Sequence, residues 1–70
     1  MNVLLLEMKM KALKISNEDM ANYLNIDAST FYRKKNGISD FSRKEMQMIK
    51  KRLNLSSEEV DHIFFGEELT

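Results

Sequence analysis

A serine followed three residues later by an acidic residue occurs three times in this 70-residue chain, and each occurrence predicts the start of a helix. The serine side chain accepts a hydrogen bond from the backbone N–H three residues on, and the acidic side chain accepts one from the serine N–H. The pairs are Ser16 with Asp19, Ser42 with Glu45, and Ser56 with Glu59. Because proline is absent and glycine occurs only twice, capping residues must set most element boundaries.

Apolar residues recur with helical spacing along the chain, and the alternation typical of strands is missing. Leu6, Met10 and Leu13 predict one face of a first helix. The inner faces predicted for the helices that follow the three serines are Met20, Ala21 and Leu24; Met46, Ile49 and Leu53; and Val60, Ile63 and Phe64.

One more helix follows from the residues between positions 25 and 37. Asn25 ends the preceding helix, because asparagine tolerates the left-handed backbone conformation better than any residue except glycine. Asp27 then caps a third helix that runs from Ala28 to Asn36-Gly37. The prediction is an all-α fold of five short helices, in a single domain over residues 1–70.

Composition argues against several classes of site. Without cysteine there are no disulfides, iron–sulfur clusters or thiolate zinc sites, and the single histidine, His62, offers no metal cluster; we expect no metal and no cofactor. No glycine-rich loop or nucleophile elbow is present, so we do not expect an enzyme. The longest apolar run, Val3 to Leu6, is far shorter than the about 20 residues of a membrane helix, and no basic residue precedes it. We therefore expect a cytoplasmic protein with no secretory signal and no membrane partner.

Charge is sorted along the chain although the net charge is zero. Residues 1–30 carry a net charge of −1, residues 31–52 carry +6, and residues 53–70 carry −5. A basic block beside an acidic end favours one basic face.

Residues 17–37 predict two short helices joined by three or four residues. Ala21 is small enough to lie where the two axes cross, with Leu24, Ile26 and Phe31 filling the wedge between the helices. The second helix then turns outward Ala28, Ser29, Tyr32, Arg33 and Asn36. This is the shape of a helix-turn-helix, whose second helix enters the major groove of DNA while the first crosses the backbone.

At these residues the chain resembles the phage Cro and repressor type of helix-turn-helix proteins, also called the XRE type. The resemblance covers about residues 4–65 and is carried by Ala21, by Leu24-Asn25-Ile26, by Asn36-Gly37 and by Ile49 to Leu55. The segments Thr30 to Arg33 and Phe41 to Glu45 look closest to small uncharacterised phage regulators of that type. The resemblance implies a lambda-repressor-like DNA-binding domain with the helix-turn-helix at about residues 17–36, in a bacterial host cell.

Three positions depart from the family's pattern. Asn25 replaces the turn glycine, and Lys34 stands where an apolar core residue is usual, so we expect its stem along the core and its amine outside. Lys35 replaces a frequent acidic residue, and Met10 lies where some members place the basic partner of that residue.

The predicted base-reading residues are Ala28, Ser29, Tyr32 and Arg33. The Arg33 guanidinium can donate two hydrogen bonds to guanine, although a surface arginine paired with an acid is the alternative. The resemblance implies phosphate contacts from Asn17 and Asn36, and an arginine near the minor groove at Arg43. Thr30 and Lys44 are further candidates for contacts with the DNA backbone.

One short helix cannot bury all of its apolar side chains here, which include Phe64, Phe65 and Leu69. These three residues therefore predict a dimer interface. The alternative is that Phe65 folds back onto its own domain. The leading hypothesis is a sequence-specific transcriptional regulator, a Cro-like repressor that binds a near-palindromic DNA operator as a homodimer, with no small-molecule ligand. The alternative is a protein-binding module of the same fold, with an antirepressor or antitoxin-like partner and little DNA affinity.

Overall fold

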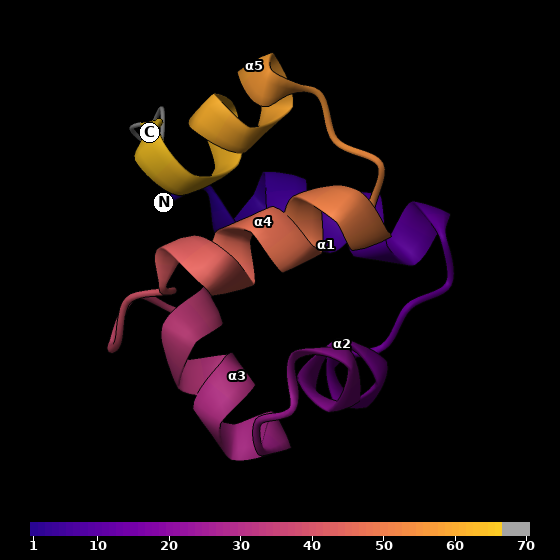
Figure 1. Cartoon of the computed structure of the whole chain (residues 1–70), viewed down its shortest axis with the longest axis vertical. Coiled ribbons are helices and arrows are strands. Elements are labelled where there is room, and N and C mark those ends of the chain that lie inside the picture. The colour runs from indigo at the N-terminus through magenta and orange to yellow at the C-terminus, as the bar shows by residue number, and fades with distance from the viewer. Residues whose placement is uncertain (67–70) are drawn as a thin grey trace.

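The structure, a computed structural model, describes residues 1–66. This part of the chain consists of short helices joined by loops. Its elements are α1 (Val3–Ala12), α2 (Asn17–Leu24), α3 (Ala28–Lys35), α4 (Arg43–Arg52), α5 (Ser57–Val60) and a π-helical turn, η1 (Asp61–Phe65) (Figure 1). Within this range there are five α-helices and no strand, as predicted, except that the fifth helix is one turn long and continues into η1. None of the helices in the described range has the length and apolar character needed to cross a membrane.

All three serine caps form. Each serine hydroxyl accepts a hydrogen bond of 3.0–3.1 Å from the N–H of its acidic partner, and each serine N–H donates one of 2.8–3.1 Å to the carboxylate of that partner. Asn2 adds a cap that was not predicted, because its Oδ1 accepts a hydrogen bond of 3.1 Å from the N–H of Leu5. Asp27 has the extended backbone of an N-cap, but its side chain accepts no hydrogen bond from α3, so the prediction of a side-chain cap is wrong.

Left-handed residues follow each of the first four helices. They are Lys14, Asn25, Gly37 and Asn54, with φ between 53° and 83°. Asn25, at φ 60° and ψ 43°, ends α2 as predicted. Leu13 is half exposed and does not continue the inner face of α1, because α1 ends at Ala12 and the chain turns away there.

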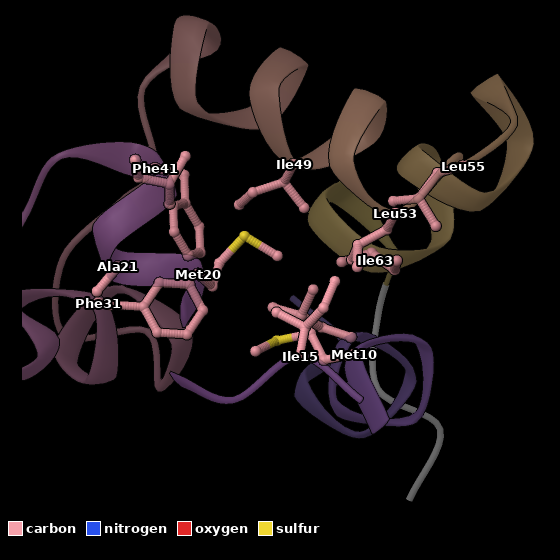
Figure 2. Packing of buried hydrophobic residues seen from close by; sticks show 12 residues of the cluster. Met10, Ile15, Met20, Ala21, Phe31, Phe41, Ile49, Leu53, Leu55 and Ile63 are labelled. Atoms are coloured by element: carbon pink, nitrogen blue, oxygen red, sulfur yellow. The ribbon is translucent and has the colours of Figure 1, made fainter. Parts of the chain in front are cut away.

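The largest fully buried side chains come one from each of α1 to α4 and one from η1. These residues are Leu6, Met20, Phe31, Ile49 and Ile63; the last four surround the centre of Figure 2. The ring of Phe41, in the loop before α4, lies 5.8 Å from that of Phe31 and 5.6 Å from that of Phe64, between centroids. The aromatic contacts therefore join α3 to η1 across the loop.

The beginning of the chain is held against η1, because the N–H of Asn2 donates a hydrogen bond of 2.7 Å to the carbonyl of Ile63. In Figure 1, where the longest axis is vertical, α5 lies at one end of the molecule and α2 and α3 lie at the other. That axis measures 28 Å.

Candidate nucleic-acid interface

The turn between α2 and α3 has three residues, Asn25 to Asp27. The N–H of Ile26 donates a hydrogen bond of 3.0 Å to the carbonyl of Ala21, which closes the end of α2. Ala21 is 1% exposed, and Leu24 and Phe31 are also buried. The residues predicted to hold the two helices together therefore do pack in the core, with Ile26 at its edge.

The outward face of α3 carries the residues that the sequence placed there. Ala28, Ser29, Tyr32, Arg33 and Asn36 are exposed, and Thr30 is half-buried. Within residues 1–66, no carboxylate lies within ion-pair distance of Arg33. In this part of the chain the guanidinium is therefore not neutralised, and its donors face solvent.

Both asparagines predicted to bind phosphate already make a hydrogen bond within the chain. The Asn17 Oδ1 accepts one of 3.1 Å from the Lys35 ammonium, and the Asn36 Nδ2 donates one of 2.8 Å to the carbonyl of Tyr32. Asn17 also shares the first turn of α2 with Glu18 and Asp19. Hydrogen bonds from the amide and hydroxyl of Ser16 lower the pKa of Asp19, which keeps this turn acidic.

Lys35, rather than Lys34, is the buried lysine of α3. It is 5% exposed, and its Nζ lies 3.4 Å from the Oε1 of Glu7 as well as close to Asn17. In the family that the chain resembles, an acidic residue is frequent at position 35, and some members place its basic partner at position 10. In this chain the base, Lys35, is on α3 and the acid, Glu7, is on α1, three residues before Met10. Through Glu7 and Asn17, Lys35 therefore links α3 to both α1 and α2.

Lys34 and Glu45 fix the start of α4 beside the end of α3. The Lys34 Nζ lies 2.7 Å from the Glu45 Oε1, and both side chains are less than a fifth exposed. The stem of Lys34 is covered as expected, but its amine is bonded to Glu45 rather than free in solvent. Partial burial raises the pKa of Glu45, but the hydrogen bonds from Lys34 and from Ser42 outweigh it and lower that pKa overall.

This contact brings the first turn of α4, with two exposed cations, near the end of α3. Arg43 and Lys44 are exposed at the first turn of α4, which begins where the loop from α3 arrives (Figure 1). At the other end of α4, the Lys50 Nζ donates a hydrogen bond of 3.2 Å to the hydroxyl of Ser57. Lys50 therefore joins α4 to α5.

Phe64 packs against the core, as its predicted place on the inner face of the fifth helix requires, and its role as an interface residue stays a prediction. It is half-buried and packs edge-on against Phe41. Phe65 is 67% exposed, and it lines a hollow of about 250 Å³ with Met46 and Val60 that is bordered by Arg43 and Lys50. Folding back of Phe65 onto its own domain is therefore not observed. Leu69 lies outside the described residues.

A scan of protein-family models, a search of curated proteins and a search of solved structures found no match to this chain. The geometry of the described residues is therefore the basis for a functional proposal. Within those residues, no group of three or more acidic or histidine side chains is arranged to hold a metal ion.

Proposed function

We propose that this protein is a sequence-specific DNA-binding transcriptional regulator of the Cro and repressor (XRE) type, with a lambda-repressor-like domain and a helix-turn-helix at about residues 17–36. The observation that carries the proposal is the pairing of α2 and α3 through a three-residue turn, with Arg33 exposed on the outward face of α3 and, within residues 1–66, in no ion pair. When two helices are paired in this way, the second is suited to enter the major groove while the first crosses the DNA backbone.

The roles assigned to α3 follow from chemistry and exposure. Arg33 donates two hydrogen bonds to the O6 and N7 of guanine, and Ser29 bonds a base edge or a phosphate. Ala28 and Tyr32 contact a thymine methyl group. Arg43 and Lys44, held near α3 by the Lys34–Glu45 ion pair, contact the DNA backbone or the adjacent minor groove.

We assign Asn17, Thr30 and Asn36 to phosphates on weaker grounds, since both asparagine side chains make hydrogen bonds within the chain. Their contacts to phosphate then come from the atoms that those bonds leave free. The acidic first turn of α2 requires the phosphate to approach from the Asn17 side, away from Glu18 and Asp19.

A homodimer on a near-palindromic operator completes the proposal. Two recognition helices related by a two-fold axis lie about 34 Å apart, one turn of duplex. The exposed Phe65 and the hollow that it shares with Met46 supply an apolar surface for the dimer. Occupation of a promoter in a bacterial cell then represses transcription by occlusion.

The first test is selection of binders from a randomised DNA duplex pool, at low salt and at physiological salt. We expect enrichment of a two-fold symmetric motif at both salt concentrations. Arg33→Ala should lose the preference for the motif by about tenfold or more, since a bidentate arginine–guanine contact discriminates by about 1–3 kcal/mol. The matched control is Lys9→Ala, which removes one positive charge from the α5 end of the molecule, where Lys9 pairs with Glu59.

The same experiment decides between this function and the alternative, a protein-binding module that uses the same fold. The exposed Phe65 and the acidic first turn of α2 favour that alternative. Binding at low salt only, with no enriched motif, would favour the protein-binding module, since nonspecific attraction to phosphate disappears as salt rises.

A further inference from the structure

A hollow of about 490 Å³ lies where the end of α1 meets the start of α2, a corner that can be followed in Figure 1. We call it the α1–α2 hollow. Its lining includes Lys11, Lys14, Lys35 and Asn17, and the acid Glu7. The three lysines and the glutamate give it a net charge of +2. Lys11 and Lys14 are exposed, and neither forms an ion pair within residues 1–66, so the hollow is positive although the whole chain has no net charge.

Lys35 is the buried cation of this hollow. Its side chain is only 7% exposed, and a lysine is almost never buried without partners. The Nζ donates a hydrogen bond of 3.1 Å to the Asn17 Oδ1 and lies 3.4 Å from the Glu7 Oε1. Because an ammonium group has three donors, one is left after these two partners. The Glu7 side chain is half exposed, so water screens its charge and it neutralises Lys35 only in part.

The hydrogen bond from Lys35 also sets the orientation of the Asn17 amide. Since the Oδ1 faces the Lys35 ammonium, the Nδ2 and its two donors are turned away from it. The groups that Lys35 and Asn17 leave free are therefore donors. Donors beside a positive charge suit an anion with several acceptor oxygens, such as a phosphate.

The backbone of Lys14 is a second feature of this corner. Lys14 has a left-handed φ of 58°, whereas the other left-handed residues within residues 1–66 are two asparagines and a glycine. A lysine thus stands where asparagine or glycine would be less strained. Strained backbone of this kind is found at functional sites. The positive charge at the hollow is what asparagine or glycine would not supply.

We propose that the α1–α2 hollow is a binding site for a phosphate group, held by Lys11, Lys14, the free donor of Lys35 and the Nδ2 of Asn17. The buried Met10 and Ile15 also line the hollow and offer an apolar surface to the carbon atoms next to the phosphate. Its volume is in the range of sites that hold small molecules. The phosphate can therefore enter together with the sugar that carries it.

A backbone phosphate of DNA is the source that the fold favours. Lys35 follows Arg33 by two residues on α3, and the first helix of a helix-turn-helix crosses the DNA backbone. The hollow includes Asn17 but neither Glu18 nor Asp19, so a phosphate enters it on the side of α2 without those acids. The source of the phosphate rests on the proposed function, whereas the site itself does not.

Titration with inorganic phosphate at constant ionic strength tests the site on the protein alone. We expect saturable shifts of the backbone amide NMR signals of Lys14 and Asn17, and no shift of Ile38, which is exposed in the loop after α3. Lys14→Asn removes the charge but suits the left-handed backbone, so it should weaken phosphate binding about threefold or more without lowering Tm. Lys14→Arg keeps the charge and should keep the affinity. No saturable shift in the unmodified protein, or equal affinity for the two variants, would overturn the proposal.

Binding to a DNA duplex of random sequence distinguishes a DNA phosphate from a free one. Each phosphate contact contributes about −0.9 to the slope of log K against log salt concentration, so Lys14→Asn should make the slope shallower by about one and Lys14→Arg should not. Phosphate binding with an unchanged slope would support the site but overturn DNA as its source, in favour of a free phosphate or a phosphorylated small molecule. Phosphate binding without an enriched DNA motif would contradict the proposed function and leave the site. An enriched motif without phosphate binding would do the reverse.

Discussion

At the scale of single residues, Lys14 has the least favourable backbone conformation in the described chain. Its φ of 58° is left-handed, where a Cβ crowds the following carbonyl at a cost of about 1–2 kcal/mol. The other left-handed residues are two asparagines and a glycine, which tolerate this region. Lys14 is also exposed, so its side chain makes no packing contribution that would offset the strain.

We therefore expect Lys14→Gly to stabilise the fold. The gain should be about 0.5–1 kcal/mol, because glycine removes the strain but adds freedom to the unfolded chain. Thermal unfolding measures it as a rise of a few degrees in Tm, since 1 kcal/mol corresponds to about 4–8 °C in a domain of this size. The same substitution at the exposed Lys11, inside α1, should instead lower Tm. A fall in Tm for both variants would show that φ at Lys14 relaxes without cost.

At the scale of elements, one carboxylate links the start of α4 to the end of α3. Glu45 accepts hydrogen bonds from the N–H of Ser42 and from Lys34, and these bonds lower its pKa below the usual 4.5. A carboxylate with a lowered folded-state pKa adds stability above about pH 4.5, and this stability is lost as pH falls through the lowered value. Acid should therefore loosen α4 from α3 before the apolar core is affected.

Glu45→Gln tests this link, because glutamine preserves the capping box but not the charge. At neutral pH the variant should be less stable by about 1 kcal/mol. Urea denaturation between pH 7 and pH 3 should show the difference from the unmodified protein shrinking below pH 4.5. Glu58→Gln, at an exposed position with no ion pair within residues 1–66, should follow the unmodified protein throughout. A constant difference across this pH range would contradict the assignment.

Local signals in the sequence predict the element boundaries but not which side chains the elements bring together. The three capping boxes and the helix end at Asn25 depend only on residues close together in the chain, so the sequence is sufficient to predict them. The sequence does not show which of Lys34 and Lys35 is buried. They lie three and four residues after the buried Phe31, so both are on its side of the helix. Which one is buried depends on Glu7 and Asn17, which are far away in the sequence. The helical pattern likewise places Phe64 on an inner face but does not predict its contact with Phe41, which comes from a distant loop.

At the scale of the whole molecule, a net charge of zero is compatible with DNA binding because the charges are separated in space. The acidic α5 lies at one end of the 28 Å axis, and α3 extends toward the other (Figure 1). At physiological salt the Debye length is about 8 Å, so repulsion between α5 and DNA bound at α3 is largely screened. Lys9 also neutralises part of the acidic end, where it pairs with Glu59 and lowers the pKa of that side chain.

The salt dependence of DNA binding tests this arrangement. Each phosphate contact contributes about −0.9 to the slope of log K against log salt concentration. Arg43→Gln should therefore make the slope shallower by about one while leaving the enriched motif unchanged, whereas Lys9→Gln should alter neither. If Arg43→Gln keeps the full slope, Arg43 does not contact phosphate. Its position on the border of the Phe65 hollow then assigns it to the dimer surface, where it changes the concentration dependence of dimerisation instead.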